Sequence, residues 1–573
     1  MTVRQIACFF MILGFCSSTT LAQISARPGP PDRYVSREIL VFPRQPGQSP
    51  ALVRKLRQQG FQVLAQAPLS GMIIAAVPAA GLELTMCQYL ELWPEVLVAE
   101  CNAIGESNQP VCPLGGTPTP TPCNTGSTGT PFPPIGASPC LPVAGLPNDP
   151  YFCYQWGVHN TGQTVRDRAC SISGGAPGCW EQTGHAGIDI GVVEAWQRST
   201  GSSAVTVAVF DSGIEYCNPD VDPARFFFPD IALTCVGDDG SSYPCCPPSS
   251  ASEESACNYG PATDNVGHGT MVASVLAATP NNQLGLAGVD HECRVLSARV
   301  VSQSESGPFG SVVAANIGRV IVALETIRYY PIYQSVRVIN MSFRFPEAFA
   351  PPASVTNLEA ACILLQADDR FIVTTSTNDG VGTADTSVPN RFSSVITVGG
   401  IDSRGWRFAS PCGFSSGTGS AVDFVAPGMA MPMLICQTNP CQTPPGVPSP
   451  CSYGGTTWQG YPCLEYYGYN FLNGTSFAAP MVCGAISLIL SHAIDLGIVD
   501  SSSWEGLTWE QMYDLLQRGA RDQVSHVPGH QGDPNDIPNL VGPVSGDTYY
   551  GWGLIDINAS LNWLEALYCP NCD

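Results

Sequence analysis

The chain has 573 residues, 44% of them apolar, and a mean hydropathy near zero (+0.08). These values are typical of globular proteins and leave room for one large domain or two ordinary ones. The 24 basic and 47 acidic residues give a net charge of −23 and a pI near 4.5, which argues against nucleic acid and anionic membranes as partners.

The first residues predict a targeting segment that is not part of the fold. Arg4 precedes an apolar stretch at residues 6–15, and Thr-Leu-Ala-Gln at residues 20–23 offers a small-residue cleavage site. The apolar stretch is too short to span a bilayer. We therefore expect residues 1–22 to be a signal peptide and the protein to be secreted, either extracellular or periplasmic.

Cysteine usage agrees with export. All but Cys8 and Cys16 of the 25 cysteines follow the signal segment, and many of them cluster in loop-like stretches. Such clusters in an exported protein predict disulfide bonds. An odd number of cysteines leaves at least one thiol without an intrachain partner, and we expect Cys483, within a long apolar run, to be buried and free.

Residues 37–102 predict a small α+β domain. Their pattern indicates a strand, a helix, two strands, a second helix and a last strand, at residues 37–44, 49–60, 61–78, 81–94 and 95–102. This β-α-β-β-α-β order is typical of a ferredoxin-like fold. Residues 103–147 are rich in Pro, Gly, Thr and Ser and predict a linker.

Three later segments each contain one residue of an acid–base–nucleophile set. VAVFDSGIEY contains Asp211, NVGHGTMVASVLAA contains His268 and NGTSFAAPMVCGA contains Ser476. A serine hydroxyl is a poor nucleophile until an imidazole takes its proton, and a carboxylate fixes the tautomer of that imidazole. Each residue alone could be a turn or helix-cap residue. Their order and flanking residues together favour a catalytic triad.

The local patterns suit these roles. Residues 205–210 form an apolar run that predicts a buried parallel strand ending at Asp211. His268 lies just before a helix-like run, and Ser476 opens an apolar helix expected at roughly residues 476–492. Open α/β sheets place their sites at the carboxyl ends of strands, so we expect these three side chains to meet there.

The flanking motifs Ser-Gly-Ile, Gly-His-Gly-Thr and Asn-Gly-Thr-Ser-Phe-Ala-Ala-Pro, with the chain order Asp, His, Ser, resemble those of subtilisin-like serine proteases, the subtilase or peptidase S8 family. The resemblance extends over residues 148–565. It implies a three-layer α/β fold with a mostly parallel central sheet, with Cys-rich insertions at about 217–260 and 429–470 and a tail at 566–573. It also implies a serine endopeptidase that hydrolyses peptide bonds of proteins and acts as a monomer.

The resemblance also implies an oxyanion site and a substrate pocket. FIVTTSTNDG, at residues 371–380, is similar to the family strand whose asparagine binds the oxyanion, here Asn378. Family members usually have Leu-Gly after the Asn-Met-Ser-type motif, whereas this chain has Phe343-Arg344. The change implies either a narrower pocket or a preference for acidic or extended polar substrates, unless Arg344 turns to solvent. The implied pocket residues are Ser342, Phe343, Arg344, Thr375, Ser376 and Thr377.

Two further features follow from the resemblance. The domain at residues 37–102 is similar in order and position to the inhibitor-type propeptide of subtilases, so we expect a self-processing zymogen cleaved near Asn102 or within the linker. A structural calcium ion is implied as cofactor, because oxygen ligands of the family's site match positions of this chain. The matching positions are Gln155, Asp220, Asn282, Leu284 and Leu286.

Two other functions stay open. The chain could be a catalytically weak or inactive scaffold that binds peptides, or it could be a different hydrolase such as an esterase. An esterase of the α/β-hydrolase type would show a Gly-x-Ser-x-Gly motif and a Ser–Asp–His order. Peptide binding without turnover would favour the scaffold, and activity on esters alone would favour the esterase.

Overall fold

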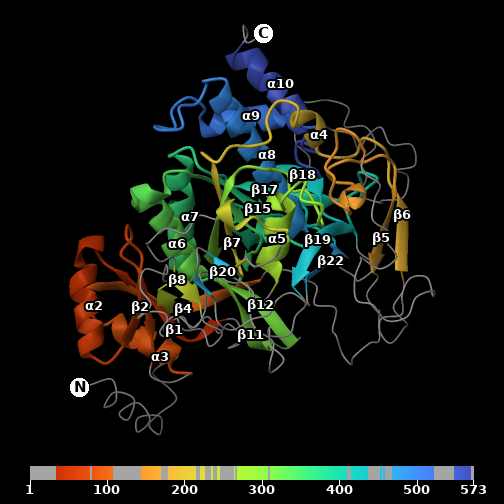
Figure 1. Ribbon diagram of the computed structural model, residues 1–573. Coiled ribbons are helices and arrows are strands. Elements are labelled where there is room, and N and C mark those ends of the chain that lie inside the picture. Colours follow the sequence, from red (N-terminus) through yellow and green to blue (C-terminus); the bar gives the residue numbers. More distant parts are fainter. Residues whose placement is uncertain are drawn as a thin grey trace.

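The structure is a computed structural model of the whole chain (Figure 1). It describes residues 34–77, 81–106, 143–168, 179–214, 220–225, 234–236, 242–244, 264, 267–307, 310–409, 415–436, 452–453, 456–457, 467–521 and 548–569. The expected signal peptide, most of the linker and most of both Cys-rich insertions lie outside these residues.

A parallel six-stranded sheet forms the centre of the larger domain. Its strand order is β10-β7-β13-β15-β17-β18, and every neighbouring pair is parallel. The strands are β7 (Thr206–Asp211), β10 (Arg294–Arg299), β13 (Val336–Met341), β15 (Phe371–Thr375), β17 (Ile396–Ile401) and β18 (Phe424–Pro427). The predicted parallel α/β core is therefore confirmed.

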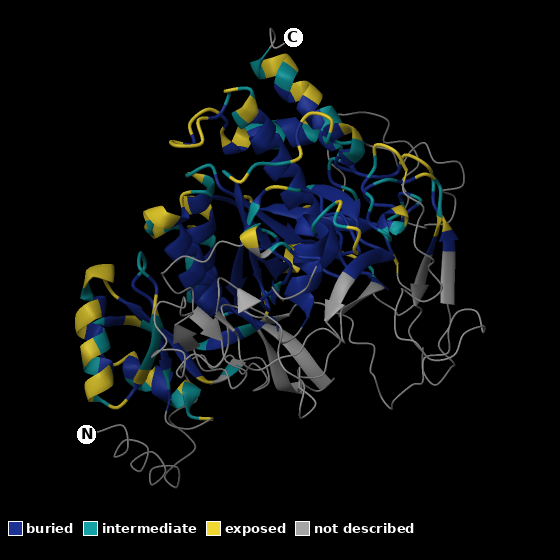
Figure 2. Ribbon diagram, viewed as in Figure 1, coloured by how far each residue is buried: buried dark blue, intermediate teal, exposed yellow. Residues whose placement is uncertain are grey.

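Helices cover both faces of this sheet, because its strands are apolar on both sides. Val207 and Val209 of β7 face one core with α5 and α8, whereas Ala208 and Phe210 face a second core with α6 and α7. The helices of these three layers are α4 (Val192–Ala195), α5 (His268–Ala277), α6 (Ile317–Tyr329), α7 (Pro352–Gln366), α8 (Thr475–Asp495), α9 (Trp509–Gly519) and α10 (Ile557–Tyr568). The sheet and the helix faces toward it are almost wholly buried (Figure 2).

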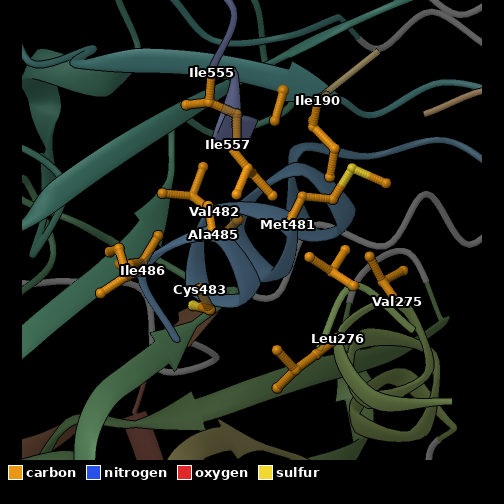
Figure 3. Close-up of a cluster of buried hydrophobic side chains, with 14 of the residues drawn as sticks. Ile190, Val275, Leu276, Met481, Val482, Cys483, Ala485, Ile486, Ile555 and Ile557 are labelled. Carbon is orange, nitrogen blue, oxygen red and sulfur yellow. The ribbon is translucent and has the colours of Figure 1, made fainter. Parts of the chain in front are cut away.

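Helix α8 is the central helix of the domain. It is the one helix in the described part of the chain that is long and apolar enough to cross a membrane, and nearly all of it is buried in the fold. Its side chains are surrounded by Val275 and Leu276 of α5 and by Ile555 and Ile557 near the start of α10 (Figure 3). Cys483 of α8 is buried and is a free thiol, as predicted.

The N-terminal domain has the predicted β-α-β-β-α-β order. Its antiparallel strands lie in the order β4-β1-β3-β2. The strands begin three residues before and end four residues after the predicted domain of 37–102, because β1 still pairs with β4 at Tyr34, across a register shift, and the end of β4 pairs with β12. The elements are β1 (Tyr34–Pro43), α2 (Ser49–Gln58), β2 (Gln62–Gln66), β3 (Ile73–Ala76), α3 (Glu83–Leu90) and β4 (Val96–Glu106).

One sheet joins the two domains. Strand β4 pairs antiparallel with β12 of the larger domain, which pairs with β11. The sheet that joins the domains includes β11 (Val301–Gly307) and β12 (Gly310–Asn316). The remaining strands form small antiparallel pairs. Helix α10 extends three residues past the predicted domain end at 565. The strands of the small pairs are β5 (Thr164–Arg168), β6 (Cys179–Thr183), β8 (Thr234–Val236), β9 (Ser242–Pro244), β14 (Phe345–Pro346), β16 (Ser387–Val388), β19 (Met431–Cys436), β20 (Ser452–Tyr453), β21 (Thr456–Thr457) and β22 (Tyr467–Leu472).

The N-terminal sheet has two apolar faces. Ile39 and Val41 of β1 pack under α2 and α3, whereas Leu40 and Phe42, on the opposite face, join the core around α6 and α7 of the larger domain. Successive side chains of a strand point to opposite faces of the sheet, so each strand contributes one face to each of the two cores. The N-terminal domain therefore packs against the larger domain through an apolar sheet face.

Buried polar contacts accompany this apolar interface. Glu38 accepts hydrogen bonds from Arg319 Nη2 (2.8 Å) and from Asn102 Nδ2 (2.9 Å). Asn102 also bonds to Asn316, which caps the N-terminus of α6. Glu100 accepts hydrogen bonds from the first turn of α7. Helix N-termini favour negative charge, so these acidic residues of the N-terminal domain suit the helices that they contact.

Candidate active site

The end of β7 and the start of α5 bring an aspartate and a histidine together. Asp211 is the last residue of β7 and His268 is the first residue of α5. His268 Nδ1 lies 2.8 Å and 2.9 Å from the two carboxylate oxygens of Asp211. An ionised carboxylate only accepts hydrogen bonds, so Nδ1 bears the proton and Nε2 is left with a lone pair.

Opposing effects act on the pKa of His268. Burial disfavours the charged ring, but the charge and the hydrogen bond of Asp211, with a smaller contribution from the charge of Asp264, outweigh it and raise the pKa of His268. His268 is fully buried, and its Nε2 has no hydrogen-bond partner among the described residues. The ring is therefore held by one nitrogen, and the other nitrogen can accept a proton.

Ser476 lies in the first turn of α8, where backbone N–H groups have no partner within the helix. Its Oγ donates a hydrogen bond of 3.4 Å to the backbone carbonyl of Ser342. The rings of His268 and Phe477 are 6.1 Å apart, so the starts of α5 and α8 lie close together.

Asn378 follows β15 and is fixed by the residue before Ser476. Its Oδ1 accepts hydrogen bonds from Thr475 N (2.9 Å) and Thr475 Oγ1 (3.0 Å). The carboxamide oxygen is thereby held toward α8, and Nδ2 lies on the side of Gly474. The sequence signal for Asn378 was a strand followed by Asn-Asp-Gly, whereas no local signal pointed to Thr475.

The implied pocket residues fall into two groups. Phe343 is buried, and its ring packs edge-on against Phe345 (5.7 Å). Ser342 Oγ donates to the backbone carbonyl of Ser476 (2.9 Å), which ties the segment to α8. Arg344 does not turn to solvent, since it pairs with Asp379 and donates to Ser387 Oγ (3.2 Å).

The other strand of the expected pocket is tightly hydrogen-bonded. Thr375 contacts Thr475 through the two hydroxyl groups, and Ser376 Oγ lies 3.3 Å from Ser416 Oγ. Thr377 has a φ of +87°, which a β-branched residue rarely adopts. Its carbonyl accepts hydrogen bonds from Gly417 N and Thr475 Oγ1, so this conformation is held on both sides next to Asn378.

The structure brings together most of the residues expected to bind calcium. Asp220 is fully buried and accepts hydrogen bonds from Asn282 Nδ2 (2.9 Å) and Leu286 N (3.0 Å). Leu284 N donates to Asn282 Oδ1. Gln155 pairs through both ends of its amide with Ala287 of the same loop. Among the described residues, no three His, Cys, Asp or Glu side chains gather as a metal site.

Asp211 at the end of β7, His268 at the start of α5 and Ser476 in the first turn of α8 lie on one parallel sheet and the helices that cover it. This arrangement defines an α/β protein of subtilisin-like fold. Comparison with known proteins agrees: the profile of the subtilase family (peptidase S8) matches residues 202–553. The chain therefore belongs to the subtilase family.

Individual relatives are distant. A thermophilic serine proteinase of Bacillus sp. strain AK1 is 27% identical over 298 residues, which are 52% of this chain and 55% of that protein. Subtilisin DY of Bacillus licheniformis is 29% identical over 301 residues, which are 52% of this chain and 78% of that protein. The solved structure of fervidolysin from Fervidobacterium pennivorans, described as a keratinolytic enzyme related to subtilisin, has a TM-score of 0.54 at 16% identity. The match covers 94% of this chain and 62% of that one. The chain spans about half the length of several of its curated relatives, and fervidolysin supports the fold alone.

Proposed function

We propose that the protein is a serine endopeptidase in which Ser476 is the nucleophile. His268 takes the proton of Ser476 through Nε2 and later delivers it to the leaving amine, while Asp211 orients the ring and stabilises its charged form. The observation that supports this most directly is the pair of short contacts between His268 Nδ1 and Asp211, which leaves Nε2 as the base.

Asn378 and the backbone N–H of Ser476 bind the oxyanion in this proposal. The tetrahedral intermediate needs donors that are already oriented when negative charge develops. Thr475 holds the carboxamide of Asn378 by its oxygen, which leaves Nδ2, near Gly474, to donate to the oxyanion. The N–H of Ser476 is one of the unpaired donors of the first helical turn.

The N-terminal domain is an intramolecular inhibitor in this proposal, and the protein is made as a zymogen. Its apolar sheet face, the Glu38–Arg319 ion pair and the pairing of β4 with β12 support a stable complex. Cleavage near Asn102 would cut a buried strand, because Asn102 has no exposed surface and β4 continues to Glu106. We place the maturation cut beyond Glu106, within the linker of residues 103–147.

Arg344 does not present a free positive charge to substrates, because Asp379 neutralises it. We therefore favour a narrowed pocket, filled in part by Thr377 and Arg344, over a pocket selective for acidic side chains. Protein and peptide substrates with small or medium residues before the cleaved bond suit this arrangement.

Calcium is proposed as a structural ion at the loop around Asp220. The donor set fits, since a carboxylate, an amide oxygen and backbone carbonyls are the ligands that Ca²⁺ prefers. Asp220 and Asn282, with the carbonyls of Leu284 and Leu286, would hold the ion, and Gln155 would have to release Ala287 to join them.

Export and a monomeric state complete the proposal. Residues 1–22 are the proposed signal peptide, and one relative, from Xanthomonas campestris, bears the name extracellular protease. Cys153 and Cys569 each take part in a disulfide bond, which suits an oxidising compartment.

The deciding experiment compares the precursor with Ser476→Ala. We expect the unmodified precursor alone to lose its N-terminal domain, with a new N-terminus between residues 107 and 148, and to cleave a denatured protein substrate. If both proteins stay intact and neither cleaves protein while both bind peptides, the binding scaffold replaces the protease. If only ester substrates are cleaved, the esterase does.

A further inference from the structure

A carboxylate outside the Asp–His–Ser set lies at the start of α5. Asp264 is buried (6% exposed) and accepts four hydrogen bonds. Ser212 Oγ (2.8 Å) and Gly267 N (2.7 Å) donate to Oδ1, while Thr270 N (2.8 Å) and Thr270 Oγ1 (2.7 Å) donate to Oδ2. All of these partners are donors, which suits an ionised carboxylate because that form only accepts hydrogen bonds.

Ser212 connects this carboxylate to the catalytic one. Its Oγ donates to Asp264 and accepts a hydrogen bond from Gly269 N (2.9 Å). Its backbone N–H donates to Asp211 Oδ1 (2.7 Å). The residues immediately before and after His268 are therefore both bonded to the Asp264–Ser212 pair, and the same pair holds the carboxylate of Asp211.

The contact between α5 and the end of β7 is also sterically tight. A Cβ added at Gly269 would lie 2.0 Å from the carbonyl oxygen of Gly213 and 3.1 Å from Cβ of Asp211. The helix start thus rests directly on the turn after β7. A small movement of this turn would change the distance between the His268 ring and Asp211.

We propose that Asp264 is a positioning residue for catalysis, which fixes the start of α5 against the end of β7 and thereby orients the His268 ring toward Asp211. The inference rests on the proposed function, since it assumes that His268 is the base. Asp264 reaches no reacting atom and acts through Ser212, Gly267 and Gly269.

Asp264 also influences His268 by its charge. The charged groups that act on the ring are Asp211 from β7 and Asp264 from the segment before α5, whereas Ser476 and Phe477 on α8 are uncharged. Burial lowers the pKa of His268, and both carboxylates raise it. Loss of the negative charge at residue 264 would therefore lower the pKa of His268.

The test compares Asp264→Asn with Thr270→Val as the matched control. Asn keeps the size of the side chain but removes the charge and places an amide N–H₂ against donors. Val removes one of the four hydrogen bonds and leaves the charge. The readouts are kcat and KM per active site, counted with a fluorophosphonate label, and the pH dependence of kcat/KM.

We expect Asp264→Asn to lower kcat about a hundredfold, the loss that a displacement of about 1 Å can cause, with KM little changed. The acidic limb of its kcat/KM profile should move to lower pH, because a His268 with a lower pKa stays neutral at lower pH. Thr270→Val should keep the acidic limb of the unmodified protein, and Asp264→Glu should restore it, because both variants retain the charge.

An acidic limb of Asp264→Asn that coincides with that of the unmodified protein, with equal kcat per active site, would overturn the inference. So would the same limb shift in Thr270→Val. If Asp264→Asn yields no processed enzyme, the titration of His268 is followed by NMR in the Ser476→Ala precursor with and without the substitution, and equal pKa values overturn the inference. Failure of the proposed function would be distinct, because the unmodified precursor would then cleave protein no better than Ser476→Ala.

Discussion

Substitution of Glu38 by Gln tests whether the buried ion pair holds the N-terminal domain in place. Glu38 is 3% exposed, and its partner Arg319 has no exposed surface. Burial lowers the pKa of Arg319 and the charge of Glu38 opposes that shift, while nearby Arg299 adds a second positive charge. Gln keeps the shape of Glu38 but removes the negative charge that lies against the buried Arg319 guanidinium.

The size of the effect follows from distance and burial. Arg319 Nη2 and Glu38 Oε1 are 2.8 Å apart, and an effective dielectric constant of about 20 gives a gross attraction of about 6 kcal/mol. Desolvation offsets part of this attraction, and removal of one partner of a buried pair costs about 3–5 kcal/mol. Lys55 and Glu95 are also 2.8 Å apart, but both are about one-third exposed (36% and 35%). An exposed pair of this kind contributes at most about 1 kcal/mol.

The assay is equilibrium denaturation of the Ser476→Ala precursor, which cannot process itself if Ser476 is the nucleophile. We expect Glu38→Gln to lower the free energy of the first unfolding transition by about 3–5 kcal/mol. The matched control Glu95→Gln should lower it by less than about 1 kcal/mol. Equal effects of the two substitutions would refute the argument that burial of the ion pair decides its contribution.

Four further outcomes are expected. Asn378→Ala should lower kcat about 10²- to 10³-fold with KM little changed, the loss typical of an oxyanion donor, and a drop below tenfold would remove Asn378 from that role. The acidic limb of kcat/KM in the processed enzyme should lie above pH 6.5, because Asp211 outweighs burial and raises the pKa of the His268 base; a limb well below that value would contradict the geometry. Asp379→Asn should increase cleavage after acidic residues, since it removes the charge that neutralises Arg344, and an unchanged cleavage profile would place Arg344 away from the substrate. Chelation of calcium should lower the melting temperature of the unmodified protein but not that of Asp220→Asn, and equal losses would place the ion elsewhere.

The sequence predicted the parts of the site that depend on short segments. The apolar run before Asp211 fixed a strand end, and the Gly-His-Gly-Thr motif fixed a helix start at His268. The apolar patterns in the N-terminal domain likewise predicted the order of its strands and helices along the chain, because each element has its own local pattern. These elements arise from local periodicity, which needs no knowledge of distant contacts.

Contacts between distant segments could not be predicted in this way. Thr475 forms a hydrogen bond with Asn378, which lies 97 residues earlier in the chain. Arg344 forms an ion pair with Asp379, although β14, α7 and β15 lie between them in the chain. Strands β11 and β12 likewise join β4 of the N-terminal domain in one sheet, a pairing between segments far apart in the chain. The environment of each of these residues is decided by tertiary packing alone.

If the N-terminal domain is removed as proposed, its pairing through β4 with β12 has a consequence for the remaining protein. Residues 314–316 of β12 would then present an open backbone edge beside β11. Such an edge is a template for any extended chain, including another copy of the same protein. Processing would thus create a surface prone to self-association, and the high negative charge of the chain would oppose that aggregation by mutual repulsion.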